Sequence, residues 1–79
     1  MRITVKCFAS SREIVGRREL VIDVRAGATV ADLRDVLFEI YPRLIDLRLR
    51  FAVNAVYAAQ EMELHDGDEV ACIPPVGGG

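Results

Sequence analysis

The fold of this 79-residue chain is decided by the stretch TVADLRDVLFEIYP, residues 29–42, which has the strongest helix signals in the sequence. Thr29 is a favourable N-cap residue, and Asp32 three positions later completes a capping box with a shorter acid than usual. Apolar side chains at helical spacing define one face: Val30, Leu33, Leu37, Ile40 and Tyr41. Because Pro42 disfavours helical geometry at the preceding residue, we predict an amphipathic helix over residues 30–41.

Two stretches before this helix have the period-two pattern of strands with one buried face. Their alternating apolar residues are Ile3, Val5 and Cys7 in the first, and Leu20, Ile22 and Val24 in the second. Between them, residues 10–15 indicate a short helical turn that is started by serine and stopped at Gly16. The connection is short, which favours an antiparallel pair of strands.

Three strands are expected after the helix. Residues 51–58 predict a hairpin with Asn54 in the turn, because asparagine tolerates left-handed backbone geometry. A turn signal at residues 66–68 precedes a mostly apolar strand, residues 69–73, which we expect at the centre of the sheet. The leucines of residues 44–49 have no clear period. This order predicts an α+β fold, a β-grasp two-layer sandwich, with a mixed sheet, one main crossing helix and parallel first and last strands.

Composition excludes several classes of protein. Hydrophobic residues make up 52% of the chain, too many for a disordered protein, and the net charge is −2. Basic and acidic residues are interspersed, so the basic stripe of a nucleic-acid binder is missing. No apolar run approaches the ~20 residues of a membrane span, and the first residues lack the apolar core of a signal peptide. We therefore expect a cytoplasmic protein without nucleic-acid or membrane partners.

Catalytic and metal-binding groups are scarce. Two cysteines, Cys7 and Cys72, and one histidine, His65, are too few for a zinc or iron–sulfur site, so no metal is expected. His65 lies beside Asp66 in a turn, where a solvated side chain is the simplest interpretation. The cysteines lie on strands that should be neighbours. Burial as a small apolar side chain is the preferred interpretation for Cys7, and the orientation of Cys72 depends on the register of its strand. No catalytic group of its own is therefore expected in this chain.

The sequence ends in PPVGGG, residues 74–79, and this stretch predicts an extended tail on a domain of residues 1–73. Prolines favour an extended exit, and glycines add little to a packed core. Six residues at ~3.3–3.6 Å each reach about 20 Å. Without Cβ atoms, such a tail with a carboxylate at its tip fits a narrow channel. On composition alone, an expression remnant or a frayed end explains the glycines at least as well.

Over nearly its whole length the sequence resembles the MoaD family, the ubiquitin-like small subunits of molybdopterin synthase. The motifs that carry this resemblance are FASSRE (8–13), GATVADL (27–33), AVN (52–54), DGDEVA (66–71) and IPPVGGG (73–79). The most specific of them is the Asp-Gly-Asp-Glu-Val strand followed by Pro-Pro-Val-x-Gly-Gly. It favours a functional tail over a remnant.

The resemblance implies that the chain is a sulfur carrier. An E1-like enzyme of the MoeB type would use ATP to adenylate the carboxylate of Gly79, and a sulfurtransferase would convert it to a thiocarboxylate. The tail, with Gly78 and Gly77 as slim neighbours, would enter the large subunit, of the MoaE type. There it would donate sulfur to cyclic pyranopterin monophosphate. No cofactor bound to the chain itself is implied.

The same resemblance implies a partner-binding surface near the tail. Its residues would be Phe8, Arg12, Tyr57 and Ile73 in the domain, and Pro74, Pro75, Val76 and Gly77 in the tail. For Phe8 and Ile73, ordinary core packing is an equally good interpretation. Two alternative functions stay open. One is a related carrier for thiazole, cysteine or tRNA sulfur chemistry, and the other is a protein modifier that forms isopeptide bonds with lysines.

Overall fold

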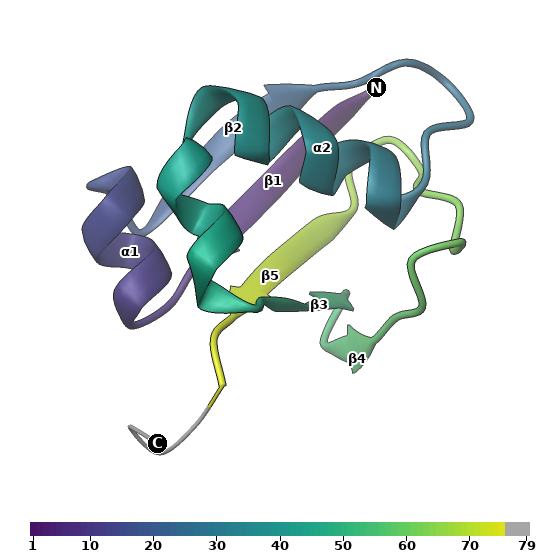
Figure 1. Ribbon diagram of the computed structural model, residues 1–79. Helices are drawn as coiled ribbons and strands as arrows, with labels where there is room; N and C mark the ends of the chain where they lie inside the picture. The colour runs from purple at the N-terminus through teal and green to yellow at the C-terminus, as the bar shows by residue number, and fades with distance from the viewer. Residues whose placement is uncertain (76–79) are drawn as a thin grey trace.

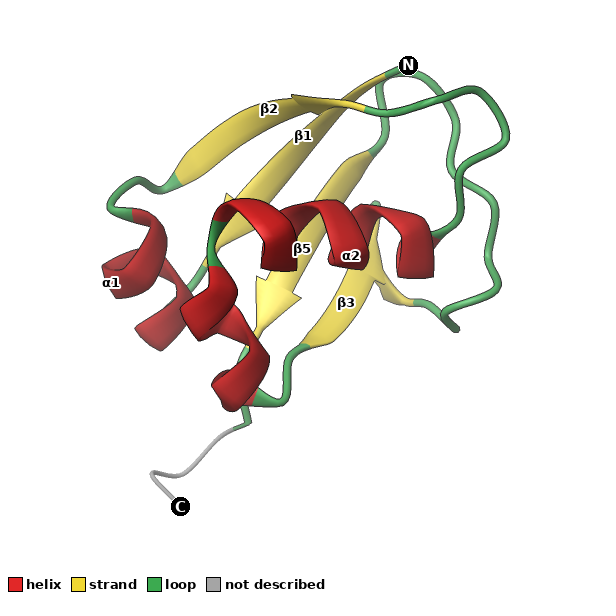
Figure 2. Ribbon diagram, turned by 45° about the horizontal axis from the view of Figure 1, so that its top comes forward, coloured by secondary structure: helices red, strands yellow, loops and turns green. Residues whose placement is uncertain are grey.

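The computed structural model describes residues 1–75. The elements along the chain are β1 (Arg2–Cys7), α1 (Ser10–Val15), β2 (Glu19–Asp23), α2 (Val30–Ile40), the 3-10 helix η1 (Pro42–Leu47), β3 (Arg50–Val53), β4 (Val56–Tyr57) and β5 (Glu69–Ile73). The strands form one mixed sheet in the order β2-β1-β5-β3-β4. Only the central pair, β1 and β5, runs parallel. The helices lie on one face of this sheet (Figures 1 and 2), so the predicted β-grasp sandwich is confirmed.

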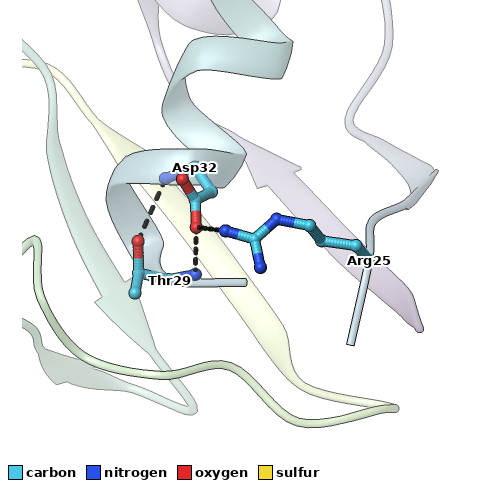
Figure 3. A network of polar contacts seen from close by, with 3 residues as sticks. All are labelled: Arg25, Thr29 and Asp32. Carbon is cyan, nitrogen blue, oxygen red and sulfur yellow. Dashed lines mark hydrogen bonds and ion pairs between the residues drawn. The ribbon is translucent and has the colours of Figure 1, made fainter. Parts of the chain in front are cut away.

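Helix α2 begins at the predicted capping box. The Thr29 hydroxyl accepts a hydrogen bond from the Asp32 amide at 3.2 Å, and the Asp32 carboxylate accepts one from the Thr29 amide at 2.9 Å. The same carboxylate oxygen lies 2.9 Å from the guanidinium of Arg25 (Figure 3). The Thr29 amide, with a smaller contribution from Arg25, holds the pKa of Asp32 below its ordinary value. These bonds fix where the helix starts.

The apolar face of α2 packs on the sheet, with one exception to the prediction. Val30, Leu33 and Leu37 are buried, as expected from their spacing. Ile40 was expected on the same face but is 52% exposed. It lies only about 20° around the helix from the buried Leu33, so its exposure follows from its place in the last turn rather than from its helical face. Tyr41, which forms the C-cap, packs against the core instead.

The two smaller helices lie beside α2. Helix α1 covers the predicted residues and ends at Gly16, whose φ of 83° is left-handed. Its first residue is Ser10, as predicted, but the N-cap is Ala9 and no side-chain hydrogen bond caps the helix. The leucine-rich stretch without a clear period forms η1. In η1, Leu44 is buried and Leu47 packs partly against the core, at the three-residue spacing of a 3-10 helix.

The predicted pairing of the strands is confirmed. β1 and β2 are antiparallel, and Asn54 and Ala55 turn the β3–β4 hairpin with φ values of 48° and 73°. Both left-handed residues match the turn geometry of two-residue hairpins. β5 lies between β1 and β3, so the strand that leads into Pro74 is central in the sheet.

Candidate functional site

One face of the sheet has no helix over it, and the alternation along β5 decides which side chains it carries. Val70 and Cys72 belong to the buried core beneath the helices. Glu69, Ala71 and Ile73 therefore point to the opposite, open face. β5 ends at Ile73, so the open face reaches the point where the chain leaves the sheet (Figure 2).

A groove of about 360 Å³ crosses this open face, and we call it the open-face groove. It is lined by Lys6, Phe8, Ala52, Ala55, Tyr57, Glu69, Ala71 and Ile73. Ala52 and Ala71 are register partners on β3 and β5, and their methyl groups leave the middle of the face low. Phe8 and Tyr57, exposed by 43% and 56%, stand higher on either side. Small side chains between larger apolar ones produce a hollow that suits an apolar partner.

The register explains how distant segments build this groove. Lys6 on β1 pairs with Ala71, Ala71 pairs with Ala52, and Ala52 pairs with Tyr57 on β4. A single row across four strands thus runs from a cation through two alanines to an aromatic ring. Neighbouring side chains in such a row contact one another.

The residue at each end of this row, Lys6 or Tyr57, contacts a charged side chain outside the row. The ammonium of Lys6 lies 3.4 Å from the carboxylate of Glu69. The guanidinium of Arg50 lies 4.1 Å from the centroid of the Tyr57 ring, within the range of a cation–π contact. Arg50 therefore keeps an exposed tyrosine in a defined position beside the groove.

Phe8 is held in place by a buried serine that the sequence analysis did not single out. Ser11 is fully buried; its hydroxyl donates to the Phe8 carbonyl at 2.6 Å and accepts from the Phe8 amide at 2.9 Å. The hydroxyl also lies 3.4 Å from the Cys72 carbonyl oxygen on β5. A serine four residues after the end of a strand is the available signal, because its hydroxyl bonds to nearby backbone. Ser11 thus fixes Phe8 next to the end of β5.

Arg12 lies on the other side of Phe8. A second hollow of about 390 Å³ is lined by Lys6, Cys7, Phe8, Arg12, Arg18 and Glu19. The Arg12 Nε donates to the Cys7 carbonyl at 3.5 Å, and its side chain is exposed. The structure therefore gathers Phe8, Tyr57 and Ile73 in one groove and places Arg12 in the adjoining hollow. Their role in partner binding stays a prediction.

The predicted tail is described only in its first two residues. Pro74 is half-buried, Pro75 is exposed, and both follow β5 outside regular secondary structure. Val76, Gly77, Gly78 and Gly79, to which the resemblance assigns sulfur transfer and partner insertion, lie outside the described residues. The division into a domain of residues 1–73 and a tail of residues 74–79 accordingly stays a prediction.

The histidine considered as a possible catalytic base lies in a surface turn. His65 is exposed, and its Nδ1 lies 4.0 Å from the carboxylate of Asp68. The His65 amide and the Asn54 side chain hydrogen-bond to that carboxylate, and they lower the pKa of Asp68. Within residues 1–75, no three His, Cys, Asp or Glu side chains are grouped to hold a metal ion. None of the helices in that part of the chain is long and apolar enough to cross a membrane.

Comparison with known proteins identifies relatives along the whole chain. The ThiS family model matches residues 5–79. The proteins named molybdopterin synthase sulfur carrier subunit in Chlamydomonas reinhardtii and Mycobacterium tuberculosis are 41% and 42% identical over 83 residues. Each alignment covers 100% of this chain, and they cover 100% and 99% of the two relatives. These similarities confirm the resemblance that the motifs indicated.

Solved structures agree with the fold. SAMP1 from Haloferax volcanii has a TM-score of 0.89 at 31% identity, covering 100% of both chains. A chain in the complex of subunits 1 and 2 of the molybdopterin-converting factor from Helicobacter pylori has a TM-score of 0.72 at 23% identity, again covering 100% of both, and is similar in fold alone. Because the family model spans nearly the whole chain, and the two relatives match all of it, this chain belongs to the ThiS family.

Proposed function

We propose that this chain is the sulfur-carrier subunit of molybdopterin synthase and that it carries sulfur as a thiocarboxylate on Gly79. The observation that carries the proposal is the full-length similarity to proteins of that name, including the Pro-Pro-Val-x-Gly-Gly motif after β5. The work of the domain is then to present one carboxyl group to two different active sites in turn.

The chemistry of the carboxyl group explains why activation is needed. A carboxylate is a poor acyl donor, because oxide is a poor leaving group. Adenylation by an E1-like enzyme releases pyrophosphate and makes the acyl adenylate of Gly79. Sulfur at the sulfide level, a hydrosulfide equivalent delivered by a sulfurtransferase, then attacks the acyl carbon, and AMP leaves. The resulting thiocarboxylate is a nucleophile, and insertion of the tail next to the pterin substrate supplies proximity.

The chain contributes no catalytic group in this proposal. Its histidine is exposed in a turn, and its two thiols are buried on the helix side of the sheet. ATP is a substrate of the activating enzyme rather than a ligand of this chain. We expect the adenylation to take place in the cytoplasm, where the E1-like enzyme has access to ATP.

The open-face groove is the proposed contact surface for both partners, the large subunit and the adenylating enzyme. It adjoins the end of β5, so a partner that covers it also surrounds the start of the tail. Its exposed Phe8 and Tyr57 are of the kind that anchors interfaces. The Helicobacter pylori complex supports a large-subunit partner for this fold.

The decisive experiment measures the intact mass of the chain after incubation with ATP, an E1-like enzyme and a sulfur donor. The proposal predicts a mass gain equal to the exchange of one oxygen atom for sulfur, located at Gly79 by peptide mapping. Two control variants, one without Gly79 and one with an alanine added after it, are expected to stay folded and to remain unmodified. Modification of either control, or an unmodified parent chain, would contradict the proposal.

A matched pair of variants tests the groove. Tyr57 and Val21 are both 56% exposed on strands of the same sheet, but Val21 lies on β2, outside the groove. Tyr57→Ala is expected to weaken binding to the large subunit by about tenfold or more, in the range of an interface anchor. Val21→Ala is expected to leave the affinity unchanged. If calorimetry gave equal affinities for the two variants, the groove would not be the contact surface for the large subunit.

The similarity to SAMP1 favours a second candidate function, a protein modifier. In that case the activated Gly79 would be attacked by a lysine amine, and an isopeptide bond would form. The two functions differ in their products. Lysine conjugates in cell extracts without any thiocarboxylate would favour the modifier, and sulfur found only in thiazole, cysteine or tRNA would favour a related carrier.

A further inference from the structure

The two cysteines of the chain are neighbours in the core. Cys7 ends β1, and Cys72 is its register partner on the parallel strand β5. Both are free thiols, exposed by only 2% and 1%. Both belong to the core cluster beneath the helices, so their side chains point to the same face of the sheet.

Parallel strand pairing brings this pair within the range of a disulfide bond. Adjacent strands lie about 4.7–4.9 Å apart. The Cα atoms of disulfide-bonded cysteines are usually about 4.4–6.8 Å apart. Because Cys7 and Cys72 share a register position and a face, their Cα separation falls within this range without a change of register.

The surroundings make the two thiols unequal. Hydrogen bonding with Cys72 and the nearby Arg12 guanidinium lower the pKa of Cys7. The same bond and burial raise the pKa of Cys72. Cys7 also lines the hollow that contains Arg12, whose Nε donates to the Cys7 carbonyl. Of the two thiols, Cys7 is therefore the one that loses its proton more readily, and the thiolate is the nucleophile in thiol oxidation.

We propose that Cys7 and Cys72 are a redox modification site that forms a reversible cross-strand disulfide when the folded chain meets a hydroperoxide. The Cys7 thiolate attacks one peroxide oxygen, the O–O bond breaks, and hydroxide leaves, which gives a sulfenic acid at Cys7. The Cys72 sulfur then attacks the Cys7 sulfur, and water leaves with the proton of the Cys72 thiol. Two thiols are oxidised by two electrons, one peroxide is reduced, and a dithiol reductant reverses the reaction.

The bond would fasten the end of β5 to the end of β1, directly before Ile73 and the tail. It would close a loop that contains most of the chain, and long loops gain most in stability from cross-linking. It lies on the helix side of the sheet, so it leaves the open-face groove unchanged.

The test treats the folded chain with hydrogen peroxide, unfolds it in the presence of an alkylating reagent, and measures its intact mass. The expected product is a monomer that has lost two hydrogen atoms, carries no alkyl group, unfolds at a higher urea concentration and returns to the starting mass with dithiothreitol. Thiols that both stay alkylatable at peroxide doses that oxidise a cysteine peptide would overturn the proposal. So would sulfinic acids without a disulfide, or disulfides only between chains.

Single variants separate the two roles. In Cys72→Ala, Cys7 is expected to stop at the sulfenic acid, which dimedone captures. In Cys7→Ala, Cys72 is expected to stay reduced under the same dose. Equal oxidation of the two variants would show that the thiols do not have the proposed roles. Where a variant does not fold, the mass of the parent chain alone decides.

Discussion

Replacing Ser11 with alanine removes a single oxygen atom from the contact between the Phe8 loop and the end of β5. That oxygen accepts the hydrogen bond of the Phe8 amide at 2.9 Å and donates to the Phe8 carbonyl at 2.6 Å. The carbonyl keeps a second partner, the Ser11 amide at 3.1 Å. The Phe8 amide loses its acceptor, so the cost of the substitution is mainly that of one unpaired donor.

The size of this cost follows from the burial of the site. An unpaired buried donor costs about 1–3 kcal/mol. The hydrogen bond is only part-buried, which places the expected loss at about 1–2 kcal/mol in the free energy of unfolding. For a domain of this size, that loss corresponds to a fall in Tm of about 4–16 °C.

Urea unfolding followed by circular dichroism measures the loss, and Ser10→Ala is the matched control. Ser10 is the first residue of the same helix, and within residues 1–75 no side-chain hydrogen bond caps that helix, so a change within about 0.5 kcal/mol is expected. If Ser11→Ala is as stable as the parent chain, or if Ser10→Ala is equally destabilised, the role assigned to Ser11 is wrong. A change in affinity for the large subunit is also expected in Ser11→Ala alone, because Phe8 lines the open-face groove.

Two further predictions concern α2. Because the pKa of Asp32 lies below its ordinary value of 3.8, its charge stabilises the fold above that pH, and the effect is lost as the pH falls through the lower folded value. Asp32→Asn should therefore lower the Tm at neutral pH, with a difference that shrinks in acid; a constant difference would refute this. Leu33→Ala, at a position with 0% exposure, should cost about 2–5 kcal/mol in urea unfolding. Ile40→Ala should cost less than about 1 kcal/mol because the side chain is at the surface, and an equal cost would mean that Ile40 is buried.

Several of the features predicted correctly from sequence have local causes, whereas the parallel pairing of β1 and β5 was predicted from the order of the elements. The capping box of α2, the two-residue turn at Asn54 and the alternation along β1 depend on residues only a few positions apart. Helix η1 was not predicted, since Leu44 and Leu47 face the core at a three-residue spacing that a short 3-10 helix shares with other structures. The exposure of Ile40 depends on where the helix meets the sheet, which its own spacing does not determine.

The candidate site was predictable only in part. Phe8, Tyr57 and Ile73 followed from a resemblance, and the structure brings all three into one groove. The low middle of that groove depends on the pairing of Ala52 with Ala71, which lie on non-consecutive strands. Register between such strands is set by tertiary packing, so nothing local to either alanine indicates its neighbour. Ser11 was missed for a related reason, because its hydroxyl acts on the backbone of Phe8 rather than on a ligand.

Transfer of sulfur from Gly79 to the pterin is the central claim, and a single-turnover reaction tests it most directly. The chain carrying a terminal thiocarboxylate is mixed with the large subunit and cyclic pyranopterin monophosphate, and its intact mass is followed with time. We predict that two thiocarboxylates return to carboxylates for each dithiolene that appears, and that the unmodified chain yields no dithiolene. A thiocarboxylate that persists in the presence of both partners, or dithiolene formed equally with the unmodified chain, would contradict the claim.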